Sequence, residues 1–94
     1  MASYKLLFKK SVAKDLRNLP RHDIKKILES ITALASDPRG HGCKKLSGQE
    51  YYRVRQGAYR IIYEITDERV IVHVIKIGHR FKIYLSRLIG RAVS

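Results

Sequence analysis

The chain has 94 residues, of which 45% are hydrophobic, and this is enough for one small domain with a modest core. Twenty Lys and Arg residues against eight Asp and Glu give a formal net charge of +12, whereas a charge of about 2–8 keeps a small domain soluble. This excess predicts a polyanionic partner, and composition alone leaves nucleic acid, an anionic membrane surface and an acidic protein open.

A single cysteine, Cys43, excludes an internal disulfide framework and fits a reducing compartment. The segment Met1–Phe8 has no apolar core of a secretory signal, and no apolar run approaches the ~18 residues that span a bilayer. We therefore expect a cytoplasmic protein with no membrane partner.

The first half of the sequence predicts a strand followed by two helices. Tyr4–Phe8 is the candidate strand, Ser11 is expected to cap the first helix, and Pro20 to end it and open the second. The second helix ends at Asp37–Pro38. Its apolar residues recur at helical spacing without a miss, namely Ile24, Ile27, Leu28, Ile31, Leu34 and Ala35.

The second half predicts three strands after a basic, Gly-rich loop at Arg39–Glu50. The strands are expected at Tyr52–Arg55, Tyr59–Thr66 and Arg69–Ile77, with turns at Gln56–Ala58 and Asp67–Glu68, a break at Gly78, and a weak helical stripe over Leu85–Ala92. The order β-α-α-β-β-β-α predicts one α/β (α+β) domain over residues 1–94. In it, an antiparallel four-stranded sheet packs against the N-terminal helical pair.

No metal or cofactor signature appears in the sequence. His41 and Cys43 lie two residues apart, but no second pair completes a set of four ligands. No Gly-rich loop opens a helix in the way that phosphate binding requires. We therefore expect neither a metal nor a cofactor.

Cations concentrate in and around the predicted sheet. Arg53 and Arg55 are two apart on one strand and so share a face, and Arg60 lies just across the turn. Arg80 follows the last strand, with Tyr84 close behind. Arginine can donate hydrogen bonds to two phosphate oxygens at once, and tyrosine stacks on bases. Such a cluster therefore suits the binding of an RNA phosphodiester.

These residues also have structural interpretations. Arg53 and Arg55 fit the solvated face of a short strand, which the pattern alone favours, and Tyr84 fits a core aromatic equally well. Lys44–Lys45 fits an exposed pair that adds to the positive electrostatic field of the whole protein. His73, between two valines, fits a structural role, whereas His79 adjoins the cation cluster and is harder to explain by structure alone.

At these residues the chain resembles the RelE/ParE superfamily, and RelE-type toxins in particular. The resemblance covers most of the chain, and its elements are quite specific in combination. They are Leu16, Leu19–Pro20, Asp37–Pro38, Lys45–Gly48, Tyr52–Ile65, Val74–Arg80 and Tyr84.

The resemblance implies a toxin of a type II toxin–antitoxin pair that cuts messenger RNA in the ribosomal A site. Matching positions make Arg55, Arg60, Arg80 and Tyr84 the expected catalytic set. The residues expected to bind RNA are Arg53, Lys44, Lys45, His79 and Lys82. The reaction it implies is metal-independent attack by the RNA 2′-hydroxyl, which leaves a 2′,3′-cyclic phosphate. The expected partners are a cognate antitoxin and the ribosome with its messenger RNA. The toxin and the antitoxin are expected to form a complex, which includes the case of a heterotetramer.

One departure concerns the general base. Some relatives carry Lys at the positions of Arg53 and Arg55, and a Lys with a lowered pKa can take a proton, whereas Arg, with a pKa above ~12, cannot readily do so. His79, Tyr84 and a ribosomal group remain as candidates. Two other functions also stay open, namely a ParE-like inhibitor of DNA gyrase without catalysis and a basic module bound to ribosomal RNA.

Overall fold

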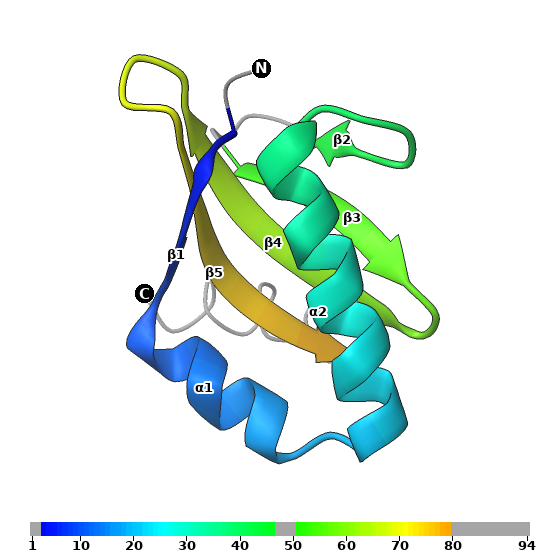
Figure 1. The fold of residues 1–94 in the computed structure, drawn as a ribbon. Helices are drawn as coiled ribbons and strands as arrows, with labels where there is room; N and C mark the ends of the chain where they lie inside the picture. The colour runs from blue at the N-terminus through cyan, green and yellow to red at the C-terminus, as the bar shows by residue number, and fades with distance from the viewer. Residues whose placement is uncertain (1–2, 47–50, 80–94) are drawn as a thin grey trace, which may run out of the picture.

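A computed structural model of the chain describes residues 3–46 and 51–79. Two helices and five strands follow in the order β1 (Lys5–Phe8), α1 (Lys10–Arg17), α2 (Arg21–Ser36), β2 (Lys44–Lys45), β3 (Tyr51–Gln56), β4 (Tyr59–Thr66) and β5 (Ile71–His79). The strands form one sheet in the order β1-β5-β4-β3-β2, and both helices pack on the same face of it (Figure 1). The α+β fold with an N-terminal helical pair is confirmed.

The sheet differs from the prediction in strand number and in direction. It has five strands, and β1 runs parallel to β5, whereas the other neighbours are antiparallel. The extra strand, β2, lies in the predicted loop and has no apolar pattern, because Lys44 and Lys45 are both exposed at the sheet edge. A parallel neighbour requires a crossover, which the two helices and three strands between β1 and β5 provide.

Three smaller predictions are wrong. Helix α1 begins at Lys10 with Lys9 as its N-cap, so Ser11 lies inside it and caps nothing. Gly78 does not break β5, because it sits in the ladder opposite Arg60. The last turn spans Asp67 to Val70, with Val70 at φ 56°, and is longer than the predicted two residues. The predicted C-terminal helix lies outside the described residues.

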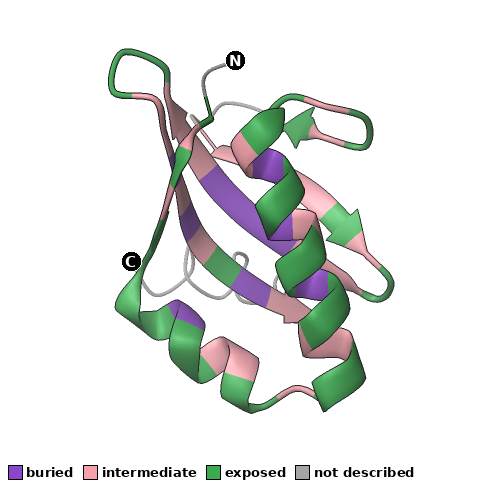
Figure 2. Ribbon diagram, viewed as in Figure 1, coloured by how far each residue is buried: buried purple, intermediate pink, exposed green. Residues whose placement is uncertain are grey.

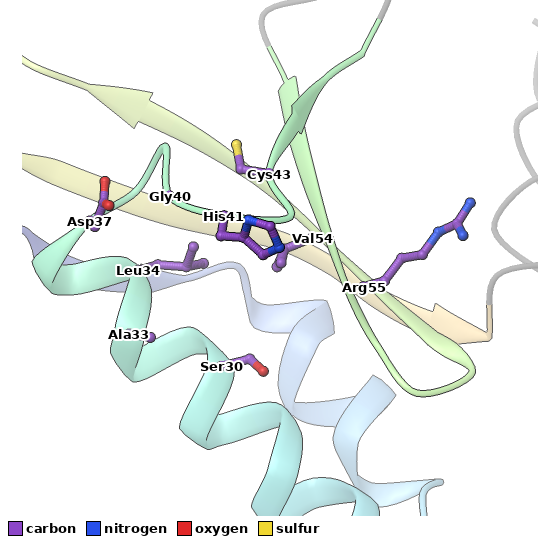
Figure 3. A pocket seen from close by; sticks show the side chains of 9 residues that line it. All are labelled: Ser30, Ala33, Leu34, Asp37, Gly40, His41, Cys43, Val54 and Arg55. Atoms are coloured by element: carbon purple, nitrogen blue, oxygen red, sulfur yellow. The ribbon is translucent and has the colours of Figure 1, made fainter.

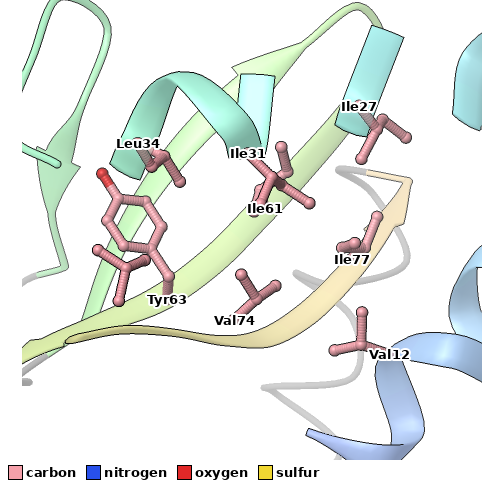
Figure 4. Packing of buried hydrophobic residues seen from close by; sticks show 9 residues of the cluster. Val12, Ile27, Ile31, Leu34, Ile61, Tyr63, Val74 and Ile77 are labelled. Atoms are coloured by element: carbon pink, nitrogen blue, oxygen red, sulfur yellow. The ribbon is translucent and has the colours of Figure 1, made fainter. Parts of the chain in front are cut away.

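The core joins the helices to the central strands (Figures 2 and 4). The apolar stripe of α2 contributes Ile27, Ile31 and Leu34, and α1 contributes Val12. The sheet contributes Ile61, Tyr63, Val72, Val74 and Ile77. These residues are at most 5% exposed. Because most apolar burial lies on this one face, the opposite face of the sheet is available for polar side chains.

A β-bulge in β5 keeps the core residues in phase. Ile62 pairs with Lys76, whereas its neighbour Tyr63 pairs with Val74, so Ile75 is an extra residue without a partner on β4. The extra residue shifts the alternation by one, and Ile77 therefore faces the helices as Val74 does. Without it, Lys76 would face the core.

A polar network ties the loop after α2 to the last turn. The Arg39 guanidinium donates two hydrogen bonds to the Asp67 carboxylate, at 3.0 and 2.9 Å, and the Tyr4 hydroxyl donates a third at 2.8 Å. These bonds hold the pKa of the Asp67 carboxyl below its usual value. Arg39 also lies over the ring of Tyr52, which stacks on Tyr63 with 5.9 Å between ring centroids. The surface network is thereby connected to the core.

We predict that Tyr63→Phe destabilises the fold by about 1–2 kcal/mol in urea denaturation at pH 7, because a buried carbonyl loses its partner. The Tyr63 hydroxyl donates a 2.7 Å hydrogen bond to the Pro38 carbonyl, and both residues are buried. As a control, Tyr4→Phe removes an exposed hydrogen bond and should change stability by less than about 0.5 kcal/mol. Equal losses in the two variants would contradict this account of Tyr63.

The same residue gives a pH dependence. Burial, followed by the neighbouring Cys43 thiol, raises the pKa of the Tyr63 hydroxyl above its ordinary value of 10.0. The resulting stabilisation is complete below about pH 10 and is lost as the pH rises further, because only the unfolded chain then ionises. Stability measured from pH 9 to 11 should therefore fall more steeply in the wild type than in Tyr63→Phe.

Candidate functional site

The face of the sheet that points away from the helices carries the predicted cations. Val54 and Ile61 pack toward the core, so the residues that alternate with them, Arg53, Arg55 and Arg60, project from the opposite face. Arg55 pairs directly with Arg60, and Arg53 lies two residues along the same strand. The three arginines that the sequence suggested do share one surface.

Strand β2 extends this surface by one residue. Lys44 pairs with Arg53 and so lies on the same face, whereas Lys45 pairs with Tyr52, which packs against the core. The two lysines therefore project to opposite sides of the sheet. We call Lys44, Arg53, Arg55 and Arg60 the cation face.

Like charges directly opposite each other destabilise a pair of strands. Arg55 and Arg60 stand in this relation, and Arg55 is exposed while Arg53 and Arg60 are half-buried. Within residues 3–46 and 51–79, neither Arg53 nor Arg55 forms a salt bridge with a carboxylate. Guanidinium groups this close together offer several donors to an anion that binds between them.

His79 lies on the other side of the sheet from the cation face. It pairs with Tyr59 at the end of β5, and its ring meets the Tyr59 ring edge-on, with 6.0 Å between centroids. The Tyr59 hydroxyl in turn donates a 3.1 Å hydrogen bond to Asp23 of α2, on the helix side. The imidazole and the Arg60 side chain thus project from opposite faces. Arg80, Lys82 and Tyr84 lie outside the described residues.

An ion pair on the same face as the arginines was not foreseen. His73 Nδ1 lies 3.5 Å from Glu64 Oε1, and both side chains are about two-fifths exposed. The sequence interpretation gave His73 a structural role, because it lies between two valines in a predicted strand. Its register opposite Glu64, which is in phase with Arg60, is the signal that places it on this face.

The described part of the chain holds no cluster of three or more His, Cys, Asp or Glu residues that suits a metal ion. In that same part, no helix is long and apolar enough to span a membrane.

Comparisons with known proteins identify a family and several relatives of this chain. Residues 6–84 match the family described as the ParE toxin of the type II toxin–antitoxin system parDE. Toxin RelE3 of Methanocaldococcus jannaschii is 37% identical, over 85% of this chain and 94% of the relative. The mRNA interferase toxin RelE of Escherichia coli is 28% identical, over 83% of this chain and 84% of the relative.

A solved structure gives the same result for the fold. A chain of the toxin–antitoxin complex RelBE2 from Mycobacterium tuberculosis superposes with a TM-score of 0.76 at 27% identity, over 84% of this chain and 93% of that one. With the family match over most of the chain and toxins named RelE among its relatives, the chain belongs to the RelE/ParE superfamily of type II toxins, as a toxin of the RelE type.

Proposed function

We propose that this toxin is a ribosome-dependent endoribonuclease that cuts messenger RNA in the ribosomal A site and thereby inhibits translation. The observation that carries the proposal is Arg55 directly opposite Arg60, with Arg53 and Lys44 beside them on one face. Four cations at this spacing suit successive phosphates of a single RNA strand. The name mRNA interferase of the Escherichia coli relative supports the same activity.

The reaction proposed is attack of the RNA 2′-hydroxyl on the adjacent phosphorus. The bond to the 5′-oxygen breaks, and the products carry a 2′,3′-cyclic phosphate and a free 5′-hydroxyl. This chemistry needs in-line alignment and stabilisation of charge on the phosphorane oxygens, and it needs no metal. Arg60 and Arg80 stabilise that charge, Arg53 and Arg55 grip the backbone, and Tyr84 stacks on the nucleotide.

Lysine and histidine at the margin of the site have lesser roles in this scheme. Lys44 extends the grip on the backbone, because it lies beside Arg53. Lys45, on the other side of the sheet, and Lys82 add to the general positive field that attracts RNA. His79 binds RNA only where the strand passes around the end of β5, because its ring lies on the helix side.

The described residues of the cation face include no side chain that is suited to act as the general base. Arginine keeps its proton, and His79 projects away from the cation face. His73 lies on the correct face, but Glu64, its partner, is four residues from Arg60, about 13 Å along an extended strand. A general base must lie within about 3 Å of the proton it takes. His73 is too far from Arg60 for that role and is placed instead to contact a neighbouring nucleotide of the RNA. We infer that Tyr84 or a ribosomal group completes proton transfer, which gives dependence on the ribosome a chemical reason.

We further propose that an acidic cognate antitoxin neutralises the toxin in the cytoplasm, in a heterodimer or a heterotetramer. The solved RelBE2 structure from Mycobacterium tuberculosis, to which this chain is similar, is a toxin–antitoxin complex. A net charge of +12 favours an acidic partner and speeds its association. An antitoxin that covers the cation face would block entry to the ribosome.

A second candidate is non-catalytic inhibition of DNA gyrase, which the match to the ParE toxin family favours. The cation face argues against it, because binding a protein target does not require arginines opposed on a strand pair. Under this alternative, loss of Arg80 or Tyr84 would leave toxicity intact.

We predict that purified toxin cuts a defined messenger RNA within an A-site codon only when programmed ribosomes are present. Arg80→Ala and Arg60→Gln should each reduce the rate by about 100-fold or more, as loss of a donor to a developing anion does. Arg17→Gln, an exposed change on α1, serves as the charge-matched control and should leave the rate within twofold. Growth arrest by protein that cuts no RNA under either condition would refute the nuclease and favour gyrase.

A second prediction concerns the salt dependence of RNA binding. Fluorescence anisotropy of a labelled single-stranded RNA should give a linear fall of log affinity with log salt concentration. Arg53→Gln and Arg55→Gln should each make the slope shallower by about 0.7, the value for one lost phosphate contact on a single strand. Lys25→Gln on the exposed side of α2 removes the same charge and should change the slope little. Equal changes in all three variants would mean that only net charge matters.

A further inference from the structure

A second row of side chains crosses the same face of the sheet as the cation face. Glu64 of β4 pairs with His73 of β5 on one side and with Tyr51 of β3 on the other, so the three residues lie side by side on three strands. Glu64 is four residues from Arg60, an even number along one strand, and the row therefore projects away from the helices as Arg60 does. We call Tyr51, Glu64 and His73 the outer row.

The outer row places a carboxylate beside the cations. Glu64 Oε1 lies 3.5 Å from His73 Nδ1, and both side chains are about two-fifths exposed. An ion pair as exposed as this adds little to stability. In the described part of the chain, Glu64 forms no salt bridge with Arg53, although Arg53 lies on the neighbouring strand. The carboxylate is therefore available to donors from outside the protein.

The chemistry of a carboxylate selects the part of an RNA strand that it can bind. An ionised carboxylate accepts hydrogen bonds and donates none, so it repels a phosphate and attracts N–H groups. Single-stranded RNA carries such groups on the Watson–Crick edges of its bases, which proteins recognise by hydrogen bonds and by stacking on aromatic rings. Guanine presents two adjacent donors on that edge, N1–H and N2–H, whereas each other base presents one donor group. Two adjacent donors match the two oxygens of a carboxylate.

The neighbours of Glu64 are spaced to hold a flat base. Adjacent strands lie about 4.8 Å apart, so Tyr51 and His73, on the two strands that flank β4, are about 10 Å apart at their Cα atoms. Atoms in van der Waals contact are about 3.5–4.0 Å apart, so a base stacked between two rings needs a gap of about 7–8 Å. A base between these two rings would direct its edge at Glu64.

The cavity between α2 and β3 suits the same base less well. Its volume is about 380 Å³, and its walls include the apolar side chains of Ala33, Leu34 and Val54 (Figure 3). Figure 3 also shows the Arg55 guanidinium projecting away from these residues. An RNA strand held by that guanidinium lies over the opposite face of the sheet, where the outer row is.

We propose that the outer row binds a guanine of the RNA, with the Glu64 carboxylate accepting hydrogen bonds from N1–H and N2–H and the rings of Tyr51 and His73 stacking on the base. His73 also positions the carboxylate, because it contacts Oε1. The inference rests on the proposed function, since the base belongs to the strand that the cation face grips. Glu64 is about 13 Å from Arg60 along β4, so the guanine neighbours the nucleotides at the cut bond and is not one of them.

The experiment measures RNA binding by the purified full chain without ribosomes. Fluorescence anisotropy compares seven-nucleotide oligouridines that carry one central guanine, adenine or inosine, which are purines that stack alike. The wild type should bind the guanine oligonucleotide at least about fivefold more tightly than the adenine one, the lower limit for a bidentate contact to a base. Inosine, which lacks the N2 amino group, should bind at least twofold more weakly than guanine.

Variants of the outer row separate base recognition from charge. Glu64→Gln should bring guanine and adenine within twofold of each other, and it should bind adenine at least as tightly as the wild type, because the lost carboxylate no longer repels phosphates. Glu68→Gln, exposed in the turn after β4, removes the same charge and should keep the preference. His73→Ala should reduce the preference at least twofold, whereas His73→Asn, whose amide nitrogen replaces Nδ1, should keep it.

Equal affinity of the wild type for guanine and adenine, or a preference for guanine that Glu64→Gln retains, would overturn the proposal. These outcomes are distinct from those of the nuclease. A wild-type protein that prefers guanine through Glu64 but cuts no RNA on programmed ribosomes would refute the nuclease alone. One that cuts RNA and binds guanine and adenine equally would refute the guanine site alone.

Discussion

The two-residue turn between β3 and β4 is the constraint on which the site depends. Gly57 adopts φ +61°, as the first residue of a type II′ hairpin turn does, and Gln56 therefore pairs with Tyr59. Every further pair follows from that one, including Arg55 opposite Arg60. A slip of one residue in either strand would turn its arginines toward the helices and its core residues toward solvent. The same turn thus fixes both the core and the cation face.

Helix α2 keeps this hairpin in place from the other side of the sheet. The Ser30 hydroxyl donates a 2.6 Å hydrogen bond to Gln56, and Tyr59 bonds to Asp23, so both flanks of the turn are tied to the helix. On β4, the fully buried Ile61 follows directly after Arg60. Burial on one face of the strand offsets the repulsion between arginines on the other. The packing of the helix face therefore helps to hold the arginines of the cation face in register.

Sequence patterns predicted what depends on local periodicity and missed what depends on register at a distance. The bounds of β4 are confirmed, and so is the stripe of α2 except at Leu28, which is 40% exposed, because both elements repeat apolar residues regularly. The bulge at Ile75, which moves Ile77 to the core side, has no signature in a run of β-branched residues. The side of the sheet on which His79 lies follows from that bulge, and so it was equally unpredictable. Strand β2 is two lysines long, and only its pairing with β3 identifies it.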